Sequence, residues 1–241
     1  MRIFNKLRLN AIQFTSIRKY LIYAIGEILL ITIGILIALN LNNWNQNQKT
    51  KAIEIKTLQE IHLSLSDDLK DLQFSLEFYK NCKNSSDILI SHFNNKLPYN
   101  DTLDSHFGKI GLFAVLAVRT GPFETLKSRG METIANDSLR LKIARLYDFY
   151  YKTIIEYQNI HIVNYYEIRK MFLNKFKNLI AFESASPVNY DRLLNDIVFL
   201  NTAKLSSNEA SISIYVYELA EANCKELLFE IRQEIDRLNN K

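Results

Sequence analysis

Residues 21–41 read LIYAIGEILLITIGILIALNL, and this stretch decides how the rest of the chain is interpreted. It is as long as the ~20 apolar residues that an α-helix needs to cross the hydrocarbon core of a bilayer. Glu27 is its only charged residue. Its isoleucine and leucine side chains would point in every direction around a helix, whereas a surface helix of a soluble protein keeps one polar face. The sequence therefore predicts a single transmembrane helix over residues 21–41.

A cleaved signal peptide is the main alternative for this stretch. Such a peptide has a shorter apolar region and small residues at its cleavage site, but residues 37–41 read IALNL and contain no such pattern. An uncleaved signal-anchor is therefore favoured. Aromatic residues typical of the membrane interface mark its two ends, with Tyr20 and Tyr23 at one boundary and Trp44 as the anchor at the other.

The charges on the two sides of the span differ and predict its orientation. The basic residues before it, with no acidic residue among them, are Arg2, Lys6, Arg8, Arg18 and Lys19. After the span, lysines alternate with glutamates. Because the more cationic flank stays in the cytoplasm, residues 1–20 are predicted to be cytoplasmic and residues 42–241 periplasmic. The predicted location is thus the inner membrane of a Gram-negative cell. Residues 1–20 fit either an interfacial helix on the inner leaflet or a disordered basic tail.

The net charge of +4 comes from residues 1–41, the span and the segment before it. Five of the 30 Lys and Arg residues precede Leu21 and Glu27 is one of the 26 acidic residues, so that 25 of each sign follow residue 41. A nucleic-acid-binding protein would need a basic stripe on its folded part. The composition therefore predicts contact with the lipid bilayer, including its anionic lipids, and no nucleic acid partner.

Helical periodicity dominates the chain after the span, and the whole sequence contains only 6 glycines and 3 prolines. We therefore expect an all-α fold, an elongated antiparallel helical bundle with coiled-coil character. Its long helices are predicted at about 48–95, 137–179 and 207–238. The first carries an apolar seam from Leu58 to Tyr79, and the last is expected to open with a capping box at Ser206 and Glu209. Whether the span continues directly into the first of these helices is left open.

Residues 108–136 differ from the rest, because four of the six glycines fall there. We expect two short helices, over 112–118 and 123–129, the second ending at Gly130 in a left-handed cap. This elbow of short helices is the best candidate for a pocket in the outer domain. The residues proposed to line it are Phe123, Glu124, Ser128 and Gly130. A tight corner between packed helices needs the same residue types and is the favoured interpretation.

Within the span, three small residues recur on one helical face. Gly26, Gly34 and Ala38 would let two helix backbones approach closely. Glu27 is unusual, since an ionisable group within the hydrocarbon is costly and is normally paired or functional. A helix–helix hydrogen bond or a carboxylate that reaches the interface is favoured, and a protonatable relay is the alternative.

The residue patterns of known catalytic and metal sites are missing from the sequence. The histidines, none at metal-binding spacing, are His62, His92, His106 and His161. No nucleophile elbow, P-loop or dinucleotide-binding glycine pattern occurs. Asp67 and Asp68 are expected on a solvated helical face. We therefore expect no enzyme activity, no cofactor and no metal.

The two cysteines lie far apart in predicted helices. An oxidising compartment would permit a disulfide between Cys82 and Cys224. Isolated cysteines in helices are more often small core residues, which is the favoured interpretation.

Residues 19–49, KYLIYAIGEILLITIGILIALNLNNWNQNQK, resemble the opening of an uncharacterised Gram-negative family of small membrane proteins. Members begin with K-Y-x-x-Y-A-x-G-E-I and end the span with I-G-I-L-I-A-L-x-x-N-N-W-N. A later F-x-x-L-x-S-x-G segment is similar to Phe123, Leu126, Ser128 and Gly130, followed by Leu139-Arg140 and Tyr147. Residues 120–122 and Arg129 depart from the usual pattern. The resemblance implies the membrane anchor, its topology and a helical fold. It also implies that Gly26, Glu27 and residues 42–45 belong to the pattern shared by the family. It implies no catalytic residue.

Two hypotheses of function follow from these patterns. The preferred one is a scaffold or interaction protein that is anchored in the membrane and presents a helical bundle to the periplasm. It would self-associate through the span and the Leu58–Tyr79 seam, or bind another membrane protein. The alternative is a sensory or proton-coupled accessory subunit that uses Glu27 or the 108–136 elbow. Only about twenty residues would lie in the cytoplasm, so any signal would have to pass through a partner.

Overall fold

The computed structural model describes residues 3–180 and 182–240, while the side chains of residues 3–16, 18–20 and 23 lie outside the description. The predicted interfacial face of residues 1–20 and the aromatic pair Tyr20 and Tyr23 therefore fall outside it. The chain divides into one compact unit that ends at Ile53 and a second that begins at Glu54. Helix α1 runs from Ile3 to Asn94, with no break in the helical backbone between residues 21–41 and 48–94.

The first unit consists of the N-terminal part of α1. Every large apolar side chain described between Leu21 and Leu41 is at least half exposed. The most apolar window of this region has a mean hydropathy of 2.3, and none of it is buried. By length and composition, this is the one helix among the described residues that is able to cross a membrane.

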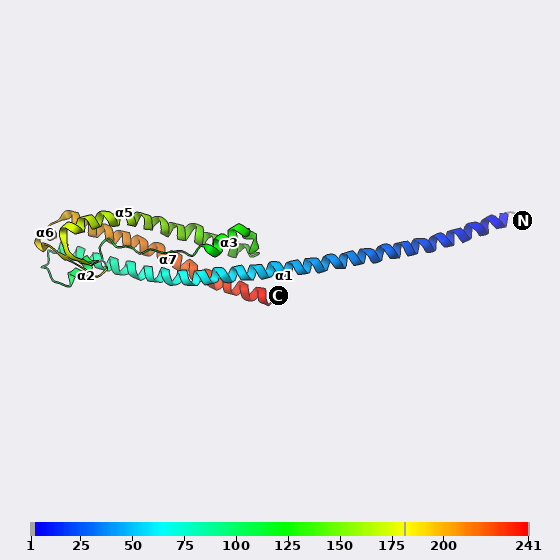
Figure 1. The fold of residues 1–241 in the computed structure, drawn as a ribbon, viewed down its shortest axis with the longest axis horizontal. Helices are drawn as coiled ribbons and strands as arrows, with labels where there is room; N and C mark the ends of the chain where they lie inside the picture. The colour runs from blue at the N-terminus through cyan, green and yellow to red at the C-terminus, as the bar shows by residue number, and fades with distance from the viewer. Residues whose placement is uncertain (1–2, 181, 241) are drawn as a thin grey trace. The chain divides into compact units, whose positions relative to one another are not determined.

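The second unit is built on three long helices. They are the part of α1 that begins at Glu54, α5 (Lys152–Lys175) and α7 (Ile197–Asn239). Figure 1 shows them side by side. Cys224 of α7 contacts Leu65 near the start of this part of α1, and Ser206 contacts Ser86 near its end, so the two helices are antiparallel. α5 is also antiparallel to α7, because Tyr151 meets Cys224 and His161 meets Ser213. An all-α fold is thus confirmed.

The helix predicted over 137–179 is three elements and ends early. Asn136 caps α4 (Asp137–Arg145), as expected, by accepting from the backbone N–H of Leu139. A π-helical turn, η2 (Leu146–Tyr151), leads into α5. The chain then becomes extended in β1 (Phe176–Ile180), which pairs antiparallel with β2 (Ser184–Pro187), Phe176 lying opposite Pro187. The prediction of helix to residue 179 is wrong, because residues 176–180 pair with β2 instead, and this tertiary pairing overrides local helix propensity.

The helix predicted over 112–118 is also wrong. After α2 (Leu103–Phe107), residues 112–119 form neither a helix nor a strand, and Thr120 already has the helical φ and ψ of −81° and −14°. Leu112, Ala114 and Leu116 are buried, whereas Val115 is exposed, which is the two-residue alternation of an extended chain. The Tyr79 hydroxyl donates to the carbonyl of Ala114 at 3.4 Å and accepts from its N–H at 3.3 Å. We call residues 112–120 the strap. It leads from α2 into α3 (Gly121–Arg129), which is followed by the short turn η1 (Met131–Thr133).

The last helix begins ten residues earlier than predicted. Asp196 caps α7, because its carboxylate accepts from the N–H groups of Val198 and Phe199 at 2.9 and 3.1 Å. The short helix before it, α6, covers only Tyr190–Leu194. The capping box predicted at Ser206 and Glu209 is therefore wrong. Ser206 is buried in the middle of α7, where its Oγ accepts from the N–H of Gly111 at 3.0 Å.

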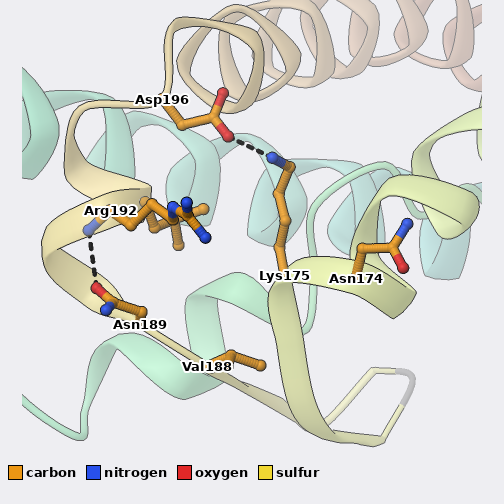
Figure 2. Close-up of a pocket in the computed structure, with 7 residues that line it drawn as sticks. Asn174, Lys175, Val188, Asn189, Arg192 and Asp196 are labelled. Atoms are coloured by element: carbon orange, nitrogen blue, oxygen red, sulfur yellow. Dashed lines mark hydrogen bonds and ion pairs between the residues drawn. The ribbon is translucent and has the colours of Figure 1, made fainter.

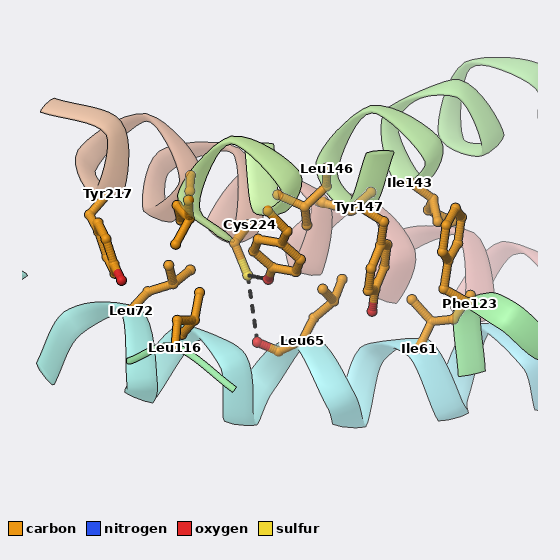
Figure 3. Close-up of a cluster of buried hydrophobic side chains, with 14 of the residues drawn as sticks. Ile61, Leu65, Leu72, Leu116, Phe123, Ile143, Leu146, Tyr147, Tyr217 and Cys224 are labelled. Carbon is orange, nitrogen blue, oxygen red and sulfur yellow. Dashed lines mark hydrogen bonds between the residues drawn. The ribbon is translucent and has the colours of Figure 1, made fainter. Parts of the chain in front are cut away.

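Two hydrophobic clusters fill the second unit. The larger one joins α1, the strap, α3, α4, η2 and α7, and Figure 3 shows part of it. The smaller one is rich in phenylalanine and lies where α2, the end of α5, β2 and the start of α7 meet. The seam predicted from Leu58 to Tyr79 belongs to the larger cluster, and Leu58, Ile61, Leu65 and Leu72 are fully buried. The seam is therefore occupied within the chain, and the expectation that it mediates self-association is wrong.

Cys82 and Cys224 are buried and free, so they form no disulfide. The Cys224 thiol donates to the carbonyl of Leu65 and accepts from the Tyr151 hydroxyl, as the dashed lines in Figure 3 mark. Burial raises the pKa of Cys82 to about 12 and that of Cys224 to about 11. Both cysteines are thus protonated core residues.

Candidate functional site

The candidate residues of the span lie on an uncovered helix. Gly26, Gly34 and Ala38 follow one another at helical spacing on α1 and therefore share one face. No atom outside the helix backbone lies within 4 Å of the position that a Cβ would take at Gly26 or Gly34. Trp44, the predicted interface anchor, is 64% exposed. The small-residue face is thus open and can receive a second helix.

Glu27 is exposed in the middle of this apolar helix and forms no ion pair with any side chain that the structure describes. The nearest basic residues before the span, Arg18 and Lys19, have side chains outside the described part. Nearby, the Thr32 hydroxyl donates to the carbonyl of Ile28 at 2.8 Å, so its polar group is satisfied within the helix. Glu27 is therefore the polar group of the described span that still needs a partner or water.

The four elbow residues do not form a common pocket. Phe123 is buried, and its ring stacks on that of Tyr147 at 4.4 Å with an interplanar angle of 6°. Glu124 and Ser128 face solvent instead, where Glu124 pairs with Lys127 at 3.6 Å. Gly130 does have a positive φ of 103°, but its ψ of 128° is extended rather than left-handed helical. The elbow is thus arranged as a packed corner, the interpretation favoured from the sequence, and these four side chains do not converge on one pocket.

An ion pair between the buried Asp68 and the partly exposed Arg119, which the sequence did not predict, holds the strap on α1. Asp68 is fully buried rather than solvated, and its Oδ1 accepts from the backbone N–H of Arg119 at 3.2 Å and from its guanidinium at 3.0 Å. Arg119 also pairs with Asp71 at 2.7 Å. Burial raises the pKa of Asp68, and the hydrogen bonds from Arg119 oppose the rise. The second carboxylate oxygen of Asp68 and the buried hydroxyl of Tyr147 have no hydrogen-bond partner within the described chain.

His161 links α5 to α7 through a second buried polar group. Its Nε2 lies 2.9 Å from Ser213 Oγ, and its Nδ1 lies 3.6 Å from the carboxylate of Glu209. The order serine, histidine, carboxylate is that of a hydrolytic triad. However, Ser213 is only 2% exposed and lies in mid-helix, where backbone N–H groups bond within the helix and cannot stabilise an oxyanion. The arrangement holds two helices together and offers no access to a substrate.

A polar pocket of about 460 Å³ lies where α5, the chain after β2, α6 and the start of α7 meet. Figure 2 shows that the side chains of Lys175 and Asp196 point toward each other across it, and they form an ion pair. Asn189 accepts from the backbone N–H of Arg192 at 2.9 Å and so caps α6. The polar groups of this pocket mostly serve the ends of helices. Among the described residues, no group of three or more His, Cys, Asp or Glu side chains has the geometry to hold a metal ion.

Comparison with known proteins gives one match. No curated protein and no solved structure matches the chain. A family model, described as a family of unknown function, DUF6090, matches residues 27–211. The matched range contains Glu27, Gly34, Ala38 and Trp44 of the apolar helix, together with the strap, the elbow and the buried Asp68 and His161. Because the match covers more than half of the sequence, the chain belongs to the DUF6090 family.

Proposed function

We propose that this protein is a membrane-anchored interaction protein without catalytic activity. In this proposal, residues 21–41 cross the bacterial inner membrane, residues 1–20 lie in the cytoplasm, and residues 42–241 present a helical domain to the periplasm. The observation that carries the proposal is the apolar helix of the first unit, none of which is buried among the described residues.

Leaving the apolar side chains of this helix in water would be energetically unfavourable. Burying a leucine or isoleucine side chain is worth about 1.5–3 kcal/mol relative to leaving it in water. The described side chains of residues 28–37 include eight large apolar residues that are 51–73% exposed. A polypeptide that left them in water would be insoluble or would associate. A bilayer covers all sides of such a helix at once and matches its length.

A partner in the membrane is the second part of the proposal. The Leu58–Tyr79 seam is buried in the second unit, so self-association must use other residues. The face of Gly26, Gly34 and Ala38 supports close approach of a second helix, and there a neighbour could also accept a hydrogen bond from a protonated Glu27. We therefore propose that a second copy or another membrane protein packs on this face.

The test combines topology with crosslinking in living cells. Alkaline phosphatase fused after Lys241 should be active, because that enzyme needs the periplasm to form its disulfides. Photoreactive residues at Leu30 and Gly34 should give adducts with a second copy or with one membrane protein. The same residue at Leu65, which is fully buried in the second unit, is the matched control and should give no intermolecular adduct. An inactive fusion, or no adduct from either span position, would contradict the proposal.

The sensory alternative rests on Glu27, which is exposed within the apolar helix. Glu27→Gln keeps the size and hydrogen-bonding capacity of the side chain but cannot release a proton. A relay requires that collapsing the proton gradient change the adducts of the parent chain, and that Glu27→Gln lose function or lose this response. An unchanged adduct pattern and phenotype would rule the relay out and leave the interaction protein.

A further inference from the structure

A second pocket, of about 390 Å³, opens on the surface of the second unit. It lies between α1, the start of the strap and the chain between β1 and β2. Its apolar walls include Phe74, Phe78, Leu112 and Phe182. Phe74 is 73% exposed and Phe182 is 57% exposed, so two aromatic rings stand in water beside a hollow that they partly enclose. Exposed aromatic surface around a concavity is typical of ligand sites.

The backbone at Phe182 adds an independent observation. Its φ is +71°, a conformation that bulky residues other than glycine seldom adopt. This conformation places its ring 5.9 Å from the ring of Phe78, with an angle of 58° between the two planes. An unfavourable backbone conformation that holds an aromatic ring over a pocket favours a role in binding over a role in folding.

The two charged side chains that line the pocket, Glu77 and Lys109, form no ion pairs within the described chain. The carboxylate of Glu77 accepts a hydrogen bond from the Asn81 amide at 3.1 Å. The Lys109 ammonium, by contrast, has no carboxylate within ion-pair distance in the described chain. Cys82 lines the same pocket, and because burial raises its pKa to about 12 its thiol is neutral. The pocket thus combines aromatic walls with one cation, Lys109, and one anion, Glu77, which is bonded to the Asn81 amide; neither forms an ion pair within the described chain.

We propose that this pocket binds a small organic carboxylate with a flat apolar body. The aromatic body would lie against Phe78 and Phe182, and the carboxylate would accept a charge-assisted hydrogen bond from Lys109. The volume is within the range of small-molecule sites. The proposal concerns the second unit alone and does not depend on the membrane anchor.

The binding test uses 2-naphthoate as the probe and the full chain in lipid nanodiscs, with empty nanodiscs as the blank. The uncharged isostere 2-naphthamide is the matched ligand. Calorimetry should find one naphthoate site per chain, with affinity about tenfold higher than for the amide, because only the carboxylate forms the charge-assisted bond. If the protein takes up no more naphthoate than empty nanodiscs, the proposal is overturned.

Two variants assign the binding to this pocket. Lys109→Gln should remove the preference for naphthoate over naphthamide, and Phe182→Ala should weaken the binding of both ligands. The matched controls are Lys204→Gln and Phe229→Ala, which change an exposed lysine and an exposed phenylalanine on α7, away from the pocket. They should leave binding unchanged. Thermal unfolding of each variant shows whether it is folded. If Phe182→Ala unfolds, Phe74→Ala removes the other exposed ring. Naphthoate binding that survives at the Lys109 variant and at a folded aromatic variant would overturn the proposal.

Discussion

The two parts of α1 have similar apolar side chains but opposite surroundings. Between Leu21 and Leu41 the large apolar residues are at least half exposed, whereas Leu58, Ile61 and Leu65 are fully buried. In the first part the apolar residues surround the helix, and in the second they form one face with polar residues on the other. The angular distribution of apolar residues thus decides what a helix can use as a partner. One face suits other helices, and a full circumference suits a bilayer.

The largest expected effect comes from replacing a leucine by alanine in each of the two parts of α1. Leu65→Ala removes a fully buried side chain and should lower the free energy of unfolding of the second unit by about 2–5 kcal/mol. Leu30→Ala, at a position that is 73% exposed, should leave it unchanged. Urea unfolding of the full chain in detergent micelles, followed by circular dichroism, measures both. Equal losses would mean that the two parts of α1 are not distinct.

The next effect tests the ion pair of the buried Asp68 on the packed part of α1. Arg119→Ala leaves the carboxylate of Asp68 buried without its counter-ion and should cost about 3 kcal/mol at pH 7. The cost stays near the low end of the usual range because the backbone N–H of residue 119 still donates to Asp68. Lys70→Ala breaks the exposed pair with Asp67 and should have no measurable effect. Adding Asp68→Asn to Arg119→Ala should recover stability, and a failure to do so would contradict the assigned cause.

Glycine substitutions give a smaller contrast between the two parts of the chain. Gly111 has a φ of +70°, and a Cβ there would lie 2.6 Å from Cδ1 of Ile168. Gly111→Ala should therefore cost about 1–3 kcal/mol of unfolding free energy. Gly34→Ala meets no atom within 4 Å and should cost the second unit nothing. Thermal unfolding compares the two variants. A Gly111 variant as stable as the Gly34 variant would show that the position does not need a positive φ.

The smallest expected effect is a difference in pH dependence between two neighbouring carboxylates. Burial raises the pKa of Asp68 in the folded protein, so its contribution to stability is present in acid and is lost as the pH rises through the folded pKa. The hydrogen bond from Lys70 lowers the pKa of Asp67, so that contribution is present above the unfolded value and is lost as the pH falls.

Unfolding of the parent chain, Asp68→Asn and Asp67→Asn between pH 3 and 7 measures these contributions. The stability of the parent relative to Asp68→Asn should fall as the pH rises, and its stability relative to Asp67→Asn should increase. The same slope for both variants would contradict the assignment of Asp68 as buried and Asp67 as exposed.

The features that could be predicted from sequence depend on local pattern. The apolar helix, the all-α class, the buried Leu58–Tyr79 seam and the cap at Asn136 each follow from residue type and spacing within one segment. The features that sequence reasoning missed depend on distant contacts. Residues 112–118 are not helical because the Tyr79 hydroxyl of α1 bonds both backbone groups of Ala114, and the partner of the buried Asp68 is Arg119, fifty-one residues away in the sequence.

The candidate site was harder to predict than the fold for the same reason. Phe123 and Ser128 are close in sequence but face opposite environments, and the aromatic pocket joins Phe78 with Phe182. One signal was available. An aspartate directly before the apolar residues 197–199 is typical of a helix start. By contrast, residues 112–117, LFAVLA, are apolar throughout and show no alternation that would predict an extended segment.

The strap illustrates how two anchoring contacts can dictate a backbone conformation. Tyr79 and Asp68 are eleven residues apart on α1, which at 1.5 Å per helical residue is about 16–17 Å. They hold Ala114 and Arg119, which are five residues apart. An extended chain advances about 3.3 Å per residue and covers the same 16–17 Å, whereas a helix over these five residues would reach only about 7–8 Å. The lengths match only when the strap is extended, so inserting or deleting one residue between the two anchors would release one of them.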